Sequence, residues 1–176
     1  MSTHRSEHGL DRRSFLKLGL ASGVALSGIS LTAGLAGCHR AEQAAAAGYA
    51  VLRDADLSLM RALIPSVMAG AMPTVAAERE TRLTDTLKGL DGMLLGLESP
   101  MRAEVLKLFD LLNFGLTRRL VAGVSSPWSD ATPQQVEEFL ARWRDSSVGA
   151  LNAGYRAVVK LAAAPFAMLS ASRAAS

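Results

Sequence analysis

The sequence has few of the residues from which catalytic centres are built. It contains one cysteine, Cys38, and three histidines, of which only His39 lies beyond residue 37. Residues 38–176 therefore lack the separate histidine that a Ser–His or Cys–His catalytic pair needs. They also lack a His/Cys cluster for zinc, haem or an iron–sulfur centre. No Gly-rich phosphate loop is present, so we expect a protein without catalytic residues, metal or cofactor of its own.

The charge pattern excludes a further class of function. The first 37 residues hold four of the 19 basic and two of the 16 acidic residues, which leaves 15 and 14 in the remainder. Basic residues interleaved with aromatics, as nucleic-acid binding requires, are missing. Carboxylate pairs fall in the first turns of expected helices, where acids offset the helix dipole, at Asp54/Asp56, Glu78/Glu80 and Glu137/Glu138.

Residues 1–37 have the pattern of a secretory signal peptide: a polar start, a basic pair and an apolar run over residues 18–36. The motif residues resemble the twin-arginine export motif, and they are Arg12, Arg13, Phe15, Leu16 and Lys17. A retained transmembrane helix is the alternative, because the run is close to the roughly 20 residues that a span needs. Four glycines in the run, each costing about 1 kcal/mol in helix propensity, favour a cleaved signal.

Cys38 ends the tetrapeptide Leu-Ala-Gly-Cys, which resembles a bacterial lipobox. We therefore expect cleavage before Cys38 and lipidation of its thiol, since two or more acyl chains anchor a protein stably to a membrane. Cleavage by the ordinary signal peptidase near Ala45 is the alternative. His39, rather than aspartate, follows the cysteine, which favours the outer over the inner bacterial membrane for a periplasmic, lipid-anchored protein.

The 139 residues after the signal have the length of one domain. We expect a tether over residues 38–53, a helical domain over residues 54–170 and a frayed tail over residues 171–176. Apolar residues recur at helical spacing, and strand-like alternation is absent. The predicted fold is an all-α bundle of about five helices, which begin near Asp54, Thr74, Ser99, Thr132 and Ser147.

Three of these helices carry specific expectations. The third should run to about Val121 and be the most buried, because apolar residues line it on several sides. Thr132 and Gln135 should form a capping box at the start of the fourth. The fifth should kink near Pro165.

Aromatic and arginine side chains gather before and within the fourth predicted helix. Aromatics and arginines are favoured as interface anchors, so this group is a candidate partner interface: Trp128, Phe139, Arg142, Trp143 and Arg144. Ordinary core packing is the alternative, because Phe139 and Trp143 are four residues apart on one helix face. The pair Arg118-Arg119 is a second candidate contact for a partner or an anion.

Residues 132–146 resemble a segment of the gluconate 2-dehydrogenase subunit 3-type small subunits, which accompany membrane-associated flavoprotein dehydrogenases. The helix containing residues 155–161 extends the similarity, and Ile64-Pro65 corresponds to an Ile-Pro element of that family. The resemblance implies a small subunit exported through the twin-arginine machinery with a folded FAD enzyme of the glucose-methanol-choline type. It also implies that the FAD and the active site lie in that large subunit, and that electrons pass to a cytochrome subunit.

Two functions remain open. The first is a non-catalytic subunit that escorts, stabilises and membrane-tethers an FAD-dependent dehydrogenase in the periplasm. The second is a stand-alone lipoprotein that binds a hydrophobic ligand between its helices, where the small residues Gly89, Gly92, Gly96 and 162–164 would leave room.

Overall fold

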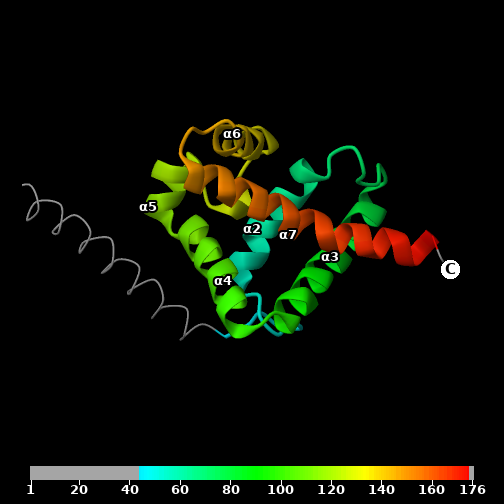
Figure 1. The fold of residues 1–176 in the computed structure, drawn as a ribbon. Coiled ribbons are helices and arrows are strands. Elements are labelled where there is room, and N and C mark those ends of the chain that lie inside the picture. The colour runs from blue at the N-terminus through cyan, green and yellow to red at the C-terminus, as the bar shows by residue number, and fades with distance from the viewer. Residues whose placement is uncertain (1–43, 175–176) are drawn as a thin grey trace, which may run out of the picture. The chain divides into compact units, whose positions relative to one another are not determined.

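The structure is a computed structural model that describes residues 44–174, with side chains to Ala171. Within this range every regular element is helical, which confirms the predicted all-α class. The elements are α2 (Asp54–Val67), α3 (Ala76–Gly96), α4 (Ser99–Asn113), α5 (Gly115–Thr117), the π-helical turn η1 (Arg118–Ala122), the 3-10 turn η2 (Trp128–Asp130), α6 (Pro133–Arg144) and α7 (Gly149–Ala174) (Figure 1).

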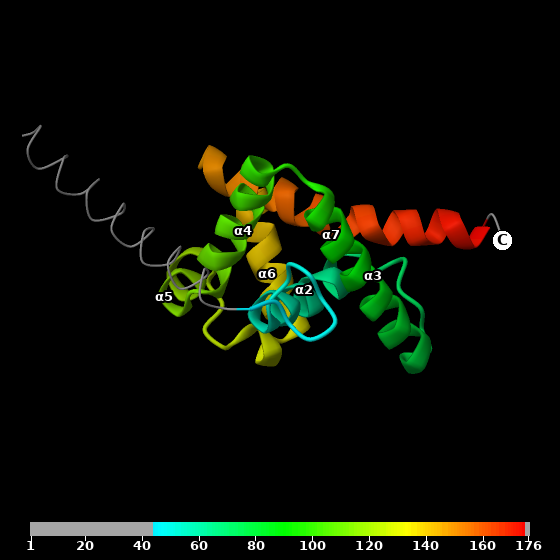
Figure 2. The same ribbon diagram turned by 90° about the horizontal axis from the view of Figure 1, so that it is seen from below.

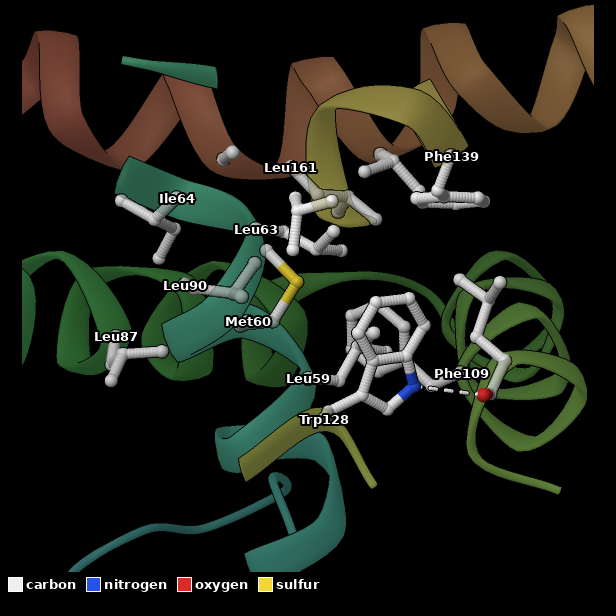
Figure 3. Close-up of a cluster of buried hydrophobic side chains, with 14 of the residues drawn as sticks. Leu59, Met60, Leu63, Ile64, Leu87, Leu90, Phe109, Trp128, Phe139 and Leu161 are labelled. Carbon is white, nitrogen blue, oxygen red and sulfur yellow. Dashed lines mark hydrogen bonds between the residues drawn. The ribbon is translucent and has the colours of Figure 1, made fainter. Parts of the chain in front are cut away.

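Helix α2 forms the centre of the bundle. It packs against α3, α4, α6, α7 and η2. Its core side chains point towards these neighbours and are fully buried (Figure 3): Leu59, Met60, Leu63 and Ile64. Burial of one such side chain contributes about 1.5–3 kcal/mol. The remaining elements therefore assemble around α2.

Helices α3 and α7 pack closely against one another. A Cβ atom on Gly89 of α3 would lie 3.2 Å from Cβ of Pro165, so the missing side chain allows the close approach. Arg82 of α3 places its guanidinium 5.0 Å from the centre of the Phe166 ring, and it donates a hydrogen bond of 3.4 Å to Ser170 Oγ. These contacts hold the helix beyond its proline.

Helix α7 extends into the predicted tail. Residues 171–174 are helical, and residues 175–176 lie outside the described range. The proline is accommodated within one helical element, because the turns that follow it contact α3.

Helix α4 is shorter and less buried than the sequence predicts. It ends at Asn113 instead of continuing to Val121, and only Phe109 and Leu112 are buried. Phe114 adopts an extended backbone with ψ 121°, after which α5 and η1 turn the chain. The carbonyl of Leu112 accepts a 2.9 Å hydrogen bond from the Trp128 indole, so a side chain satisfies an acceptor that the ended helix leaves free.

The capping box of α6 is confirmed. Thr132 Oγ1 accepts from the Gln135 amide at 3.2 Å, and Gln135 Oε1 accepts from the Thr132 amide at 3.0 Å. Helices α2 and α4 begin at the expected residues, Asp54 and Ser99, and their N-caps are Arg53 and Glu98.

Residues 46–53 form a strap that is bound to the domain, so this part of the predicted tether is wrong. Both carboxylate oxygens of Asp91 accept backbone N–H groups, from Ala50 at 2.8 Å and from Val51 and Leu52 at 2.9 Å. The Ala46 amide donates to the Leu52 carbonyl at 2.8 Å, and both residues are buried. Figure 2 shows the cyan strap on the near side of α2. Any free tether must therefore precede the strap.

A buried ionic network joins the strap to α2 and α4. The Arg53 guanidinium donates to Asp56 at 3.0 and 3.1 Å and to Asp110 at 2.5 Å. Asp56 is fully buried, and it also accepts from the Arg53 amide at 3.1 Å and from Asn113 Nδ2 at 3.0 Å. Burial lowers the pKa of Arg53, but hydrogen bonds and charges from Asp56 and Asp110 outweigh it and raise that pKa above its ordinary value.

Replacing Arg53 with methionine tests this network. Arg53→Met should lower the free energy of unfolding by about 3–5 kcal/mol, because two carboxylates lose their buried cation. Urea unfolding of the mature chain measures the loss. The matched control is Arg61→Met, which breaks the exposed 2.6 Å pair with Glu80 and should cost less than about 1 kcal/mol. Equal losses in the two variants would contradict the assignment.

Replacing Asp91 with asparagine tests the strap. One amide oxygen cannot accept all three N–H groups, and the new NH₂ group would face a backbone donor. Asp91→Asn should therefore cost about 1–3 kcal/mol, measured as a lower thermal unfolding midpoint. Lys88→Ala, an exposed change one turn earlier in α3, is the control. An unchanged midpoint in Asp91→Asn would show that the strap adds nothing to stability.

Candidate partner surface

The predicted export and lipidation residues cannot be placed in the fold. Arg12, Arg13, Phe15, Leu16, Lys17 and Cys38 all lie outside the described residues. Their assignment therefore stays a prediction from the sequence.

The aromatic part of the predicted interface belongs to the core. Trp128, Phe139 and Trp143 are at most 4% exposed. Their rings form two edge-to-face pairs, with centroids 5.6 Å apart for Trp128–Phe139 and 4.8 Å apart for Phe139–Trp143. The Trp143 indole donates to the Val121 carbonyl at 3.0 Å, as Trp128 does to Leu112. These side chains satisfy their polar groups internally, so they cannot anchor a partner in this conformation.

The two arginines of the predicted interface remain exposed and have local partners. Arg142 donates a 3.0 Å hydrogen bond to the Ala122 carbonyl at the end of η1. Gly123 follows with φ 71°, and a Cβ atom there would collide with the Arg142 guanidinium. Arg144 pairs with Asp145 at 2.9 and 3.0 Å, and this hydrogen bond lowers the pKa of the Asp145 carboxyl. Arg142 thus positions η1 rather than standing free.

The structure exposes a different group of large apolar side chains. They lie within ten consecutive residues where α4, α5 and η1 meet, and their exposed fractions run from 40% to 75%. With two neighbouring arginines they define the α4–η1 surface: Leu111, Phe114, Leu116, Leu120, Arg118 and Arg119. Figure 1 shows this corner at the edge of the bundle, beside the α5 label.

The backbone turn presents these side chains to solvent. After the extended Phe114, the Thr117 hydroxyl donates to the Phe114 carbonyl at 3.0 Å and also to the Leu111 carbonyl. The Val124 amide donates to the Arg118 carbonyl at 3.0 Å, which closes η1. A π-helical turn often marks a functional position. This one contains Leu120, whose side chain is 75% exposed.

The α4–η1 surface is positively charged. Residues 111–129 contain Arg118 and Arg119 and no aspartate or glutamate. Arg119 donates to the Ser125 carbonyl at 3.3 Å. Arg118 Nε is buried and has no hydrogen-bond partner among the described residues. This combination suits a partner whose contact face is apolar and carries carboxylates.

The described residues offer little chemistry besides this surface. Among residues 44–171, no three His, Cys, Asp or Glu side chains gather in a way that could hold a metal ion. Within the same part of the chain, no helix combines the length and apolar character needed to cross a bilayer.

The fold thus places the chain among all-α proteins, with an exposed apolar and basic corner as its candidate site. No model of a known family, no curated protein and no solved structure matches the chain. The resemblance to dehydrogenase small subunits therefore rests on the short motifs alone.

Two features that the helical pattern did not predict have signals in the sequence. Asp91 lies four residues after Leu87 and three before Leu94, which places it on the apolar face of α3, where a carboxylate needs partners. Residues 111–120 contain five large apolar residues, which lie on more sides of a helix than an edge helix buries. This surplus of apolar residues is the sequence signal for an exposed apolar surface.

The core position of Trp143 leads to a test with two glycines. A Cβ atom on Gly154 would lie 2.5 Å from Trp143 Cζ3, so Gly154→Ala should overpack the core and cost about 1–3 kcal/mol. Gly92 in α3 has open space, and Gly92→Ala should stabilise the helix by about 0.5–1 kcal/mol. Thermal unfolding of both variants distinguishes the cases. A stabilising Gly154→Ala would argue against this packing.

Proposed function

We propose that this chain is a non-catalytic small subunit that escorts, stabilises and membrane-tethers a periplasmic FAD-dependent dehydrogenase. The twin-arginine pattern around Arg12-Arg13 supports this role, because that pathway exports folded cargo and one signal can carry a partner that has none. The lipobox ending at Cys38 supports the tether. The resemblance of residues 132–146 supplies the class of partner.

The observation that carries the proposal is the α4–η1 surface. Leu116 and Leu120 are 59% and 75% exposed, beside Phe114 at 54%. Clustered exposed apolar residues with a polar rim mark protein contacts, whereas isolated ones need no explanation. In the proposed complex this surface packs against the large subunit, and Arg118 and Arg119 meet its carboxylates. The FAD and the catalytic groups belong to that subunit, with a cytochrome subunit as electron acceptor.

The alternative of a ligand between the helices loses its main support. A Cβ atom on Gly89 would lie 3.2 Å from Cβ of Pro165, closer than ordinary van der Waals contact, and a Cβ atom on Gly92 or Gly96 would meet no other atom within 4 Å. Gly92 and Gly96 are also solvent-exposed. These three glycines serve close helix packing or lie at the surface, so they do not line a space for a hydrophobic molecule.

Variants of the α4–η1 surface test the proposal. Phe114→Ser with Leu120→Ser should abolish recovery of a flavoprotein with the tagged chain, because the exposed apolar contact is lost. Both side chains are more than half exposed, so stability should change by less than about 1 kcal/mol. The measurement is co-purification from the native host, with flavin absorbance in the eluate as the readout.

The matched control is Val148→Ser with Met168→Ser, two exposed apolar residues outside this surface. The control pair should retain the flavoprotein. Recovery of the chain without any flavin-containing partner, in the unmodified protein as well, would refute the proposed function. Equal loss in both double variants would refute the assignment to the α4–η1 surface.

A further inference from the structure

The strap has a consequence for how the domain sits on a membrane. Without it, the chain between Cys38 and the start of α2 would span 16 residues and reach about 56 Å when fully extended. With the strap bound, the chain enters the fold at Ala46, whose side chain is buried and whose amide binds the Leu52 carbonyl. Only eight residue steps then separate Cys38 from the fold, a reach of at most about 28 Å.

This reach is shorter than the domain is wide. A compact domain of about 130 residues has a radius of gyration of about 14 Å, equivalent to a sphere roughly 36 Å across. A 28 Å connection cannot pass around such a body to a membrane on its far side, whereas a 56 Å connection could. The bound strap therefore restricts which side of the domain can face the anchor.

The strap and α6 lie on opposite sides of α2. The cyan strap is below α2 in Figure 1 and α6 is above it, and the view from below places the strap in front (Figure 2). The α4–η1 surface lies at a third position, at the side of the bundle (Figure 1). A contact made by the strap would thus leave both α6 and the α4–η1 surface accessible.

The composition of the strap suits a lipid surface. Residues 44–52 contain no charged side chain, and Arg53, the last residue of the strap, is buried, so no exposed ion of this segment has to be desolvated at the bilayer. Ala44, Ala45, Ala47 and Ala50 are exposed, and Tyr49 is half-buried. Tyrosine, with one apolar and one polar end, is suited to the membrane interface.

We infer that the strap fixes the orientation of the domain on the membrane. Asp91 holds the strap so that this side of the domain faces the lipid bilayer and α6 faces away. The inference rests on the proposed lipid anchor at Cys38. It adds a defined contact with a lipid surface and a role for Asp91, whose three backbone hydrogen bonds limit the reach of the anchor. The α4–η1 surface then lies beside the bilayer, where a membrane-associated partner can reach it.

Fluorescence transfer to lipid measures this orientation. The full chain is exported and lipidated in a bacterial host, and acylation of Cys38 is checked by mass spectrometry. Because Cys38 is the only cysteine, a second one introduced by Ala47→Cys or Glu137→Cys is the only free thiol to label. The first lies on the strap and the second on α6, and both positions are exposed. The labelled proteins are placed in phosphatidylethanolamine–phosphatidylglycerol vesicles that contain an acceptor lipid.

We expect a larger loss of donor fluorescence from position 47 than from position 137. Asp91→Ala should reduce this difference, while Lys88→Ala should leave it unchanged. A Gly-Ser insertion as long as the strap, placed after His39, lengthens the reach without altering the fold. The insertion should also reduce the difference in fluorescence loss between positions 47 and 137. This test remains valid if Asp91→Ala destabilises the domain.

Equal losses from positions 47 and 137 in the otherwise unmodified protein would overturn the inference, as would a Cys38 without acyl chains. Insensitivity of the difference to the insertion would overturn it too. Flavoprotein recovery is a separate readout. If the flavoprotein is recovered normally but positions 47 and 137 lose equal donor fluorescence, only the orientation is refuted. If the losses are unequal but no flavoprotein is recovered, only the proposed partner is refuted.

Discussion

The central constraint in this domain is that α2 is enclosed by its neighbours. Leu59, Met60, Leu63 and Ile64 are fully buried, and all the other long helices contact α2. An enclosed helix brings its polar N-terminus into a region with little water, where donors and charges must find partners within the protein. Asp56 and Arg53 meet that need by binding one another, Asp110 and Asn113. The burial of α2 therefore requires both the apolar centre and the ionic network.

The same constraint explains the strap. The segment before α2 must approach the buried network, because Arg53 is both its last residue and the cation that the carboxylates require. Once Arg53 is fixed, the preceding backbone lies against α3, and Asp91 accepts its N–H groups. A stretch that would otherwise be a flexible linker becomes part of the fold. This shortens the free connection to the proposed lipid anchor.

The α4–η1 surface is the opposite case, because its apolar side chains are exposed rather than buried. Within α4 only Phe109 and Leu112 are buried, and the helix does not continue to Val121. The chain instead turns at Phe114, and hydrogen bonds from Thr117, Trp128 and Arg142 to backbone carbonyls hold the turn. The apolar residues of that turn are left at the surface. A partner is the physical reason we propose for their retention there.

Much of the fold follows from local pattern. The helical spacing of apolar residues predicts α2, α3, α6 and most of α7, and the Thr132–Gln135 capping box forms as expected, because these signals act within a few residues. Local sequence does not decide whether an aromatic residue packs into the core or faces outward. Phe139 and Trp143 fit a core and an interface equally well by spacing, and only the presence of Trp128 and Val121 beside them makes them core residues.

The sequence by itself determined that the fold is all-α and how many long helices it has. It also led to the prediction of an exported, lipid-anchored chain without catalytic residues. These depend on periodicity, on short motifs and on which residue types are present. Tertiary structure decided that residues 46–53 are bound, that α4 ends at Asn113, and that the exposed apolar residues are those of the α4–η1 surface. The reason is that Asp91 meets backbone some 40 residues away, and Arg53 meets a carboxylate 57 residues away. Contacts over such separations exist only when α2 has brought α3 and α4 to its sides.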